Sequence, residues 1–523
     1  MVLITLTLGS CIPDSLNDNP NASTNLDPNL QLTTVQLLPS NDAEAWHRYL
    51  IYPGGFMNQW ANDWALVTYG GSAAKNDSYF SQLWISTYPS VITEVVDLVE
   101  RTRGVSDQIN IHAAGKVLKV QNFLRLTDYY GDIPYFDAGM AYYTGVFKPK
   151  YDTQKEIYDD FFKELKEAVT MFDDSKPRLT ADLYYDGNID RWKRFANSLR
   201  LRIAMRLIKV DPAKAKAEAE DAVKSGVFTS NDDICFVKHE RIQTTDPSGG
   251  NGLANRLLAD NKSSTFRLTK ELIGTMEDLK DPRIRFYAGS YIEDATRSEI
   301  TDQLLAHYGS YKKFTLGAQH YSYDANVAPE TNPINVTVNG ATVSVAALHQ
   351  FMQPSKLICD PGAPYVHLSY AEVEFLLAEA AYRGYNVGGT AATHFESGLR
   401  AAVNQWRTVF GASLDNLDSM LETFVTSNKL QSGKELDQIN TQLWILHFMD
   451  PFETWSNWRR TGLPAEQTKF FNYRPASNES GGQTPRRIQY PISEQGNNPE
   501  GYKEAVDRMG GKDDWMNRIW WDK

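Results

Sequence analysis

The sequence predicts a mainly α-helical protein built from packed helix pairs, with one long insertion of a different character. Apolar residues recur every three or four positions over most of the chain, a spacing that places them on one face of a helix. Several of these segments are bounded by residues that start or stop helices, such as Pro212 and Gly226. Residues 229–366 are instead rich in Gly, Asn, Thr and Tyr and interrupt the helical pattern.

The expected helices form two groups, one before and one after the insertion. The first group is Val91–Arg103, Ile111–Tyr129, Gln154–Phe172, a helix around Trp192, and Pro212–Ser225; the second is Leu368–Arg383, Thr390–Trp406 and Leu436–Thr461. Alanines at alternate positions of Pro212–Ser225 leave a low surface that allows close packing. Such helix pairs indicate degenerate tetratricopeptide-type units, each burying its face on the next, although no clean period of about 34 residues is visible.

The insertion 229–366 contains at least one expected β-hairpin. Val336–Val338 and Ala341–Val345 flank Asn339-Gly340, and Asn-Gly between two β-type runs is a strong signal for a two-residue hairpin turn. A non-repetitive insertion on a helical scaffold is a common place for binding loops. It could also be an elaboration without a binding role.

Composition and charge exclude several classes of protein. The 523 residues carry a net charge of −12, which argues against nucleic acid as the main partner, because phosphate binding needs a concentrated basic surface. The only cysteines are Cys11, Cys235 and Cys359, too few and too far apart for a disulfide-dense scaffold or a cysteine zinc site. The histidines are scattered without metal-ligand spacing, so neither a metal ion nor another cofactor is expected.

The N-terminus carries a candidate lipid anchor. An apolar run from Val2 to Leu8 leads into Leu8-Gly9-Ser10-Cys11, which matches the L-x-[GAS]-C pattern of a bacterial lipoprotein signal, although the positively charged n-region is missing. Residues 1–10 would then be a signal remnant, and residues 11–40, rich in Asn, Asp, Pro, Ser and Thr, a lipidated tether. A single helical domain would occupy residues 41–523, and the tether could equally be a disordered terminus.

No catalytic motif stands out in the sequence. It lacks H-E-x-x-H, G-x-S-x-G, a P-loop and a G-x-G-x-x-G turn after a strand. Glu372, Glu374 and Glu379 could resemble paired catalytic carboxylates, but they share one predicted helix, and solvated charge is the simpler interpretation. A binding protein rather than an enzyme is therefore expected. A glycosidase whose two carboxylates come from distant segments stays an alternative.

An early aromatic segment is the first candidate ligand site. Trp60, Trp64 and Tyr69 alternate with amide and carboxylate side chains, among them Asn62 and Asp63. Aromatic faces beside such groups suit a sugar ring, whose C–H face stacks while its hydroxyls form hydrogen bonds, and the same arrangement can bind peptides. Trp60 and Trp64, four positions apart, could equally form one core-facing turn.

Five segments resemble, in order, the SusD/RagB family of nutrient-capturing surface lipoproteins. They are Y-G-D-I-P-Y at residues 130–135, the arginine-rich helix R-W-K-R-F-A-N-S-L-R-L-R at 191–202, Y-A-E-V-E-F-L-L-A-E-A at 370–380, Q-L-W-I…F-E-T-W-S-N-W-R-R-T-G-L-P at 442–464, and R-R-I-Q-Y-P with Glu494 and Asn498 at 486–498. Singly, their aromatic and arginine residues are expected to be core or hydrogen-bonding residues; we assign the charges of the arginine-rich helix to packing and surface solvation.

The resemblance implies a SusD-like helical body at the outer membrane surface, held there by a lipid on Cys11. It implies capture of oligosaccharide fragments, or less often peptides, and delivery to a SusC-like TonB-dependent β-barrel transporter without catalysis. Family members bind ligand through an early loop and a middle region, which here points to a second aromatic cluster with Tyr308, Tyr311, Tyr321 and Tyr323. A hydrolase, or a helical-repeat scaffold that binds only proteins, are the rival interpretations.

Replacing Cys11 with alanine tests the anchor. Two or more acyl chains give stable attachment to a membrane, whereas one gives only marginal attachment. The Cys11→Ala protein should therefore appear in the soluble fraction after cell lysis, while the unsubstituted protein sediments with membranes. A variant that still sediments with membranes would contradict the lipobox interpretation.

Overall fold

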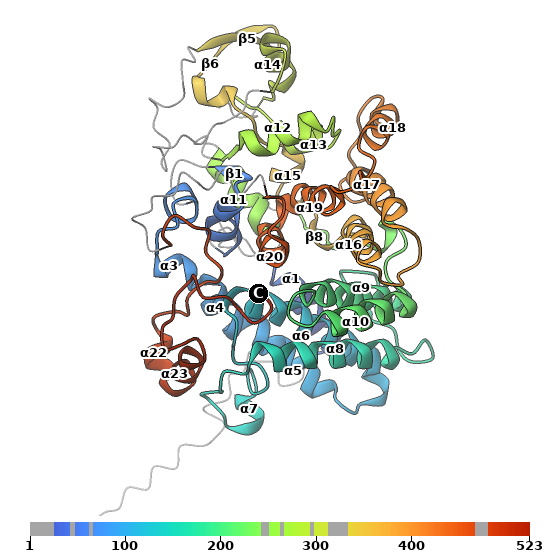
Figure 1. Cartoon of the computed structure of the whole chain (residues 1–523), viewed down its shortest axis with the longest axis vertical. Coiled ribbons are helices and arrows are strands. Elements are labelled where there is room, and N and C mark those ends of the chain that lie inside the picture. Colours follow the sequence, from blue (N-terminus) through green and yellow to red (C-terminus); the bar gives the residue numbers. More distant parts are fainter. Residues whose placement is uncertain are drawn as a thin grey trace, which may run out of the picture.

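The computed structural model describes residues 26–41, 48–61, 66–241, 250–261, 266–292, 298–311, 333–465 and 480–523. In this part of the chain the fold is mainly helical, as the sequence predicts, and the strands are short. Two helical groups occupy most of the body, while α12, α14 and the hairpin β5–β6 lie toward one end of its long axis (Figure 1). These four elements are Lys270–Asp278, Thr301–Tyr308, Ile334–Val338 and Ala341–Val345.

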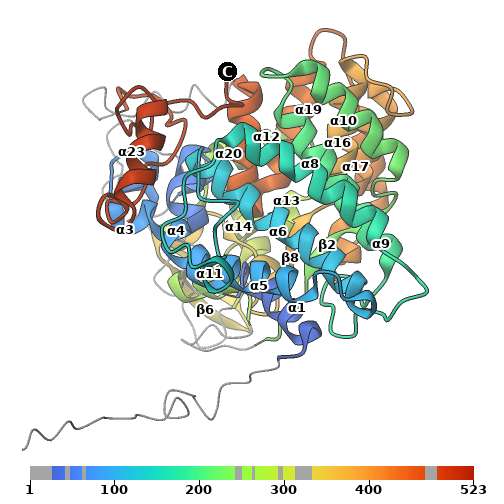
Figure 2. The same ribbon diagram turned by 90° about the horizontal axis from the view of Figure 1, so that it is seen from below.

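The first helical group precedes the insertion. It comprises α1 (Pro28–Leu37), α5 (Thr93–Thr102), α6 (Ile109–Tyr130), α8 (Gln154–Met171), α9 (Ile189–Arg206) and α10 (Pro212–Ser225). From α5 to α10 each packs on the next helix of this group (Figure 2). The predicted bounds of α10 are confirmed: Pro212 occupies its first turn and Gly226, with φ of 95°, ends it. Its buried face is alanine, which lets α9 approach closely.

The second helical group follows the insertion. It comprises α16 (Tyr370–Tyr382), α17 (Ala391–Thr408), α18 (Leu417–Ser427), α19 (Glu435–Leu446) and α20 (Pro451–Thr461). Contacts between α16 and α9 join the two groups. The single helix expected over Leu436–Thr461 is wrong, since the chain breaks into α19 and α20. Pro451 cannot continue a helix, and Asp450 caps the new one by accepting a hydrogen bond from the Glu453 amide.

Four short antiparallel strand pairs occur among the described residues, and most of their strands lie in the insertion. The pair β2–β8 (Cys235–Val237 with Tyr365–Leu368) brings the beginning and the end of the insertion together. The others are β1–β3 (Trp60–Ala61 with Arg267–Leu268), β4–β7 (Ala288–Gly289 with Gln353–Pro354) and the predicted hairpin β5–β6. The hairpin is confirmed, because Asn339 and Gly340 both have positive φ, as a two-residue turn of this kind requires.

Shorter elements fill the remaining connections. They are η2 (Leu50–Gly54), η3 (Leu66–Gly71), α3 (Asp77–Phe80), α4 (Gln82–Thr87), η4 (Tyr88–Ile92), η5 (Ser106–Gln108), α7 (Ala141–Thr144), η6 (Asn231–Asp233), α11 (Gly252–Asn261), α13 (Ile284–Tyr287), η7 (Ala347–Gln350), α15 (Lys356–Cys359), η8 (His447–Met449), α22 (Glu494–Asn497) and α23 (Pro499–Arg508). Several lie inside the insertion, which is therefore less loop-like than the sequence predicts.

The folded body begins earlier than expected. Helix α1 lies inside residues 11–40, which the sequence indicates as tether. Asp27 caps α1 and Pro28 opens it, and Leu32 and Val35 are fully buried. The Gln31 side chain donates a hydrogen bond to Asp97 on α5 at 2.7 Å. Two buried aliphatic residues on a capped helix favour packing of that helix on the body. The polar composition of the preceding segment therefore does not extend through α1.

One buried carboxylate ties the first helical group together. Asp182 accepts hydrogen bonds from the Gln36 side chain (2.6 Å), the Trp192 indole (2.7 Å) and the backbone amides of residues 184, 185 and 187. It thereby links α1, α9 and the loop between α8 and α9. The same contact explains why Trp192, the first aromatic residue of α9, is fully buried.

Replacing Asp182 with alanine should lower the free energy of unfolding by about 3 kcal/mol or more, because five buried donors lose one shared acceptor. Chemical denaturation measures this change. Asp174→Ala is the matched control, since Asp174 is exposed, and should change the free energy of unfolding by no more than about 0.5 kcal/mol. Equal effects of the two substitutions would contradict this account.

Candidate functional site

Trp60 lies in the core and not on an open face. It is fully buried; its ring stacks on Phe448 with centroids 4.1 Å apart, and its indole donates to the Phe448 carbonyl at 3.0 Å. Pairing of β1 with β3 holds the residue there. The expectation that Trp60 forms part of a ligand platform is therefore corrected. Its predicted neighbours Asn62, Asp63 and Trp64 lie outside the described residues.

The described tyrosines of the two predicted clusters do not converge on one site. Tyr69 is half-buried, with its ring 5.2 Å from that of Tyr79 on α3. Tyr308 and Tyr311 are half-buried near the end of α14, and the Tyr308 hydroxyl donates to Gln350. Figure 1 shows α14 at one end of the molecule and α3 well away from it. Tyr321 and Tyr323 lie outside the described residues, as does Cys11.

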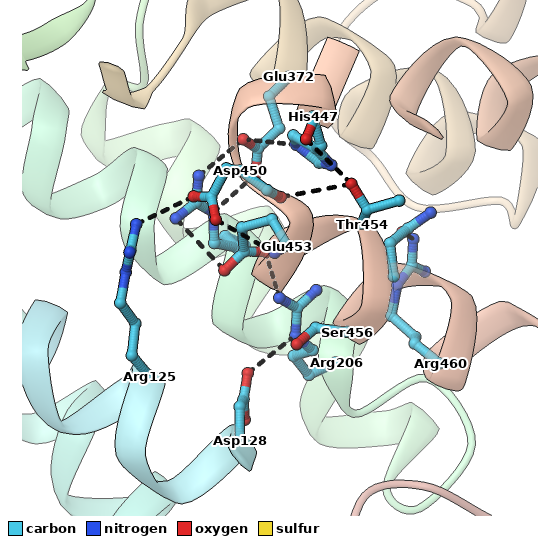
Figure 3. Close-up of polar contacts among 12 residues, drawn as sticks. Arg125, Asp128, Arg206, Glu372, His447, Asp450, Glu453, Thr454, Ser456 and Arg460 are labelled. Atoms are coloured by element: carbon cyan, nitrogen blue, oxygen red, sulfur yellow. Dashed lines mark hydrogen bonds and ion pairs between the residues drawn. The ribbon is translucent and has the colours of Figure 1, made fainter. Parts of the chain in front are cut away.

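A buried network of ion pairs joins the two helical groups (Figure 3). On α9, Arg202 forms a two-bond ion pair with Glu372 on α16, at 2.6 and 2.7 Å. One turn further on, Arg206 pairs with Glu453 on α20 and, at 3.3 Å, with Asp128 on α6. The expected surface solvation of this arginine face is wrong for Arg202 and Arg206, because carboxylates from three other helices cover it.

The network extends to both sides of α9. Arg125 on α6 pairs with Asp450 at 2.9 Å, and the His447 imidazole lies 3.0 Å from the Glu372 carboxylate. On the other side, Arg460 forms a two-bond pair with Glu379, at 2.8 and 2.7 Å. The simpler interpretation of Glu372 and Glu379 as solvated charges is thus also wrong: both carboxylates are buried counter-ions.

These carboxylates are held ionised. Burial alone would raise the pKa of Glu372, but the guanidinium of Arg202 and the adjacent His447 outweigh it and hold that pKa well below its usual range. Arg202 and Arg206 likewise hold the pKa of Glu453 down against the effect of burial, and Arg460 does so for Glu379. A glycosidase acid needs a raised pKa and a partner across an open cleft. The three glutamates therefore do not form such an acid–base pair.

A small cavity of about 60 Å³ lies against this network. Arg202, Glu372 and His447 contribute to its wall, as do residues of β8 and α17. Asn251, Ser369 and Asp450 add further polar side chains. Among the described residues, five polar atoms on side chains that line the cavity have no hydrogen-bond partner, and each of these atoms is itself buried. They are His367 Nε2, Gln405 Oε1, Trp406 Nε1 and both ring nitrogens of His447.

A wider groove of about 350 Å³ adjoins the cavity. The two share Ala363, Pro364 and Phe410 as lining residues. Charged side chains line the groove, and two of them, Arg241 and Asp360, form an ion pair at 2.5 Å. The Phe410 ring, which lines both the groove and the cavity, stacks on Trp406 with centroids 4.3 Å apart.

No sequence signal marks this cavity. His367, Gln405 and His447 are separated by dozens of residues and come from β8, α17 and η8. Within the described ranges no three His, Cys, Asp or Glu side chains are grouped as a metal site, and no helix is long and apolar enough to cross a membrane. Cys235 and Cys359 are buried and are not joined in a disulfide.

The comparisons with known proteins give the family. A family model described as "Starch-binding associating with outer membrane" matches residues 36–491. The chain belongs to the SusD-like family. This assignment confirms the resemblance of the five sequence segments and, with the described helices, the SusD-like fold. No curated protein is matched.

Solved structures place the chain among SusD-like proteins. A chitin-binding protein is 34% identical, with 95% of this chain and 100% of that chain covered and a TM-score of 0.79. A SusD-like protein of Bacteroidetes AC2a is 29% identical over the same shares, with a TM-score of 0.81. A chitin-binding SusD homolog from Flavobacterium johnsoniae is 24% identical, covers 94% and 97%, and has a TM-score of 0.69, which supports the fold.

Replacing Glu372 with glutamine should lower the free energy of unfolding at neutral pH by about 3–5 kcal/mol, because it leaves the buried charge of Arg202 without its main partner. Glu396→Gln is the control: Glu396 makes a half-exposed pair with Arg400, and its loss should cost about 0.5 kcal/mol or less. Denaturant titrations measure both.

The pH dependence of this difference follows from the lowered pKa of Glu372. Its stabilising effect is fully present above the ordinary value of 4.5 and is lost as the pH falls toward the lower folded-state pKa. The gap between the unsubstituted protein and Glu372→Gln should therefore narrow as the pH falls below 4.5. A gap that widens on acidification would show that Glu372 is not an ionised counter-ion.

Proposed function

We propose that this protein captures glycan fragments at the cell surface and passes them to a SusC-like TonB-dependent transporter, without breaking any bond itself. Membership of the SusD-like family carries the proposal. The pairing of the described buried glutamates with arginine and their lowered pKa values agree with a binding role. A lipid on Cys11 would hold the protein at the outer membrane.

Oligomers of N-acetylglucosamine are the first ligands to test. The relative that is 34% identical over nearly the whole chain is a chitin-binding protein. We infer that this chain binds the same class of glycan. A peptide ligand is the alternative, as in RagB-like proteins, and competition between a chitin oligomer and peptides would separate the two.

For the ligand platform we retain Tyr69, Tyr308 and Tyr311, together with Asn62, Asp63, Trp64, Tyr321 and Tyr323. Trp60 is left out because its ring is enclosed by the core. Tyr69 packs on Tyr79 of α3, and α3 lies well away from α14, near which Tyr308 and Tyr311 lie (Figure 1). They would therefore contact different parts of a long oligosaccharide, or belong to two subsites.

Replacing Tyr69 with alanine should weaken binding of a chitin oligomer by about five- to tenfold, since a stacked aromatic ring contributes on the order of 1 kcal/mol. Isothermal titration calorimetry measures the affinity. Tyr382→Ala is the matched control, because Tyr382 is exposed at the end of α16 and should leave affinity unchanged. If the two variants bind equally well, Tyr69 is not part of the platform; if the unsubstituted protein binds no glycan, the proposed function is wrong.

The transporter partner is tested by recovery from cells. A stable, specific interface buries at least about 1,000 Å², enough to survive gentle detergent extraction. Affinity purification of the protein from cells growing on its own ligand should therefore co-purify a β-barrel transporter. Recovery of the protein alone under those conditions would contradict the uptake role.

A further inference from the structure

Two aromatic side chains stand open on the surface of one short loop. Tyr142 and Phe147 are 90% and 82% exposed, the highest values among the large apolar side chains that the structure describes. Their loop contains α7 and lies at the end of the molecule opposite to α14 and the hairpin β5–β6 (Figure 1). Single apolar side chains are common on protein surfaces, but exposed ones gathered in one place indicate an interaction site.

The base of this loop is fixed by hydrogen bonds. The backbones of Ile133 and Asp152 exchange two of them, at 3.2 and 2.9 Å, and so close the loop. The Asp152 carboxylate also accepts from the backbone amides of Tyr135 and Phe136, at 3.1 and 2.9 Å. The two exposed rings are therefore carried by a closed loop that is held at both of its ends.

The same loop lies beside the point where the described chain begins. The Tyr143 hydroxyl donates to Asp97 on α5 at 2.6 Å, and Asp97 lies 3.7 Å from the Arg101 guanidinium. Arg101 in turn donates to the Leu26 carbonyl at 2.6 Å. A lipid on Cys11 would lie within about 50 Å of Leu26, which is the longest reach of the chain between them. The lipid would therefore hold the body by the end that carries α7.

The chemistry of the loop suits the boundary between lipid and water. Tyrosine combines an apolar ring with a polar hydroxyl, and aromatic residues gather at the level of the lipid headgroups. Phe147 is followed by Lys148, which is exposed, and by Lys150, which is exposed and pairs with Asp152 at 3.1 Å. Lysine lays its stem on apolar surface and keeps its charge in water or among headgroups. Aromatic residues next to lysines are typical of segments that lie in a membrane interface.

The small size of this tip argues against another protein as its partner. An aromatic side chain has about 150–250 Å² of surface, so Tyr142 and Phe147 together expose on the order of 400 Å². A stable protein interface takes about 800 Å² from each partner. A ring that enters a lipid surface is stabilised by its own burial, and the membrane imposes no matching shape.

We propose that the α7 loop is a membrane-contact site, at which Tyr142 and Phe147 enter the headgroup region of a lipid surface. The contact would act as a second attachment beside the lipid on Cys11, and would fix which end of the body faces the membrane. This inference rests on the lipid anchor of the proposed function for its orientation. The contact alone is weak, so it would not retain the protein on membranes during cell fractionation once the lipid is removed.

Partitioning of the unacylated protein onto lipid vesicles tests the proposal. Full-length Cys11→Ala is mixed with vesicles of phosphatidylcholine and phosphatidylglycerol, and flotation gives its partition coefficient. Adding Tyr142→Ser and Phe147→Ser together should lower this coefficient about tenfold or more, because the burial of two rings is lost. Tyr382→Ser is the matched control: it removes an exposed ring from α16 and should leave partitioning unchanged. Equal partitioning of all these variants would overturn the proposal.

A fluorescent label places the contact on the molecule. Cys235 and Cys359 are buried, so a cysteine introduced by Phe147→Cys into the Cys11→Ala protein can be labelled selectively with a polarity-sensitive NBD group. Its emission should become stronger and shift to shorter wavelength when vesicles are added. The same label on Tyr382→Cys should not respond. An unchanged signal at the α7 loop, or equal changes at both positions, would contradict a membrane contact there.

Other occupants of the loop give different results. If the serine substitutions leave vesicle binding unchanged but abolish co-purification of a β-barrel with the acylated protein, the loop belongs to the transporter interface. If they instead dissociate a dimer in analytical ultracentrifugation, it binds a second copy. Either result overturns the membrane contact and leaves glycan capture intact. The vesicle measurements use neither glycan nor transporter, so a positive result would stand even if the proposed function fails.

Discussion

The buried pairing of the α9 arginines with carboxylates from other helices is the constraint on which the rest of the structure depends. Arg202 and Arg206 contact Glu372, Glu453 and Asp128, which belong to α16, α20 and α6. These ion pairs hold α9 in one position relative to helices that are far from it in the sequence. A buried ion pair adds little net stability compared with apolar packing, but breaking one is costly because the remaining charge has no partner. We interpret the network as a device that specifies how the two helical groups dock.

The same network shapes the cavity. Glu372 and His447 both line the cavity, and the His447 imidazole lies 3.0 Å from the Glu372 carboxylate. Arg202 and Asp450 also line the cavity, each neutralised by its partner. The surface of the cavity is mostly apolar, and the charged side chains in its wall are paired.

Local features of the fold were predictable from sequence, and long-range ones were not. Pro212 and Gly226 mark the ends of α10, and Asn339-Gly340 marks the hairpin, because capping and turn geometry depend on neighbouring residues. Burial of Trp60 depends on β3 and η8, which lie more than two hundred residues further on. The arginines along α9 indicate a solvated face in the sequence, because the carboxylates that pair with them lie in distant segments. The cavity has no local signal for the same reason.

A binding role and a hydrolytic role make opposite predictions for the fate of a bound sugar. The central claim is that this SusD-like protein captures a glycan and releases it unchanged. Mass spectrometry of chitohexaose held with a stoichiometric amount of the protein, in a sample where calorimetry shows saturation, tests the claim most directly. The account predicts that only the intact hexamer is recovered after prolonged incubation. Shorter chitin oligomers that accumulate with time in proportion to the protein, and are lost on heat denaturation, would contradict it.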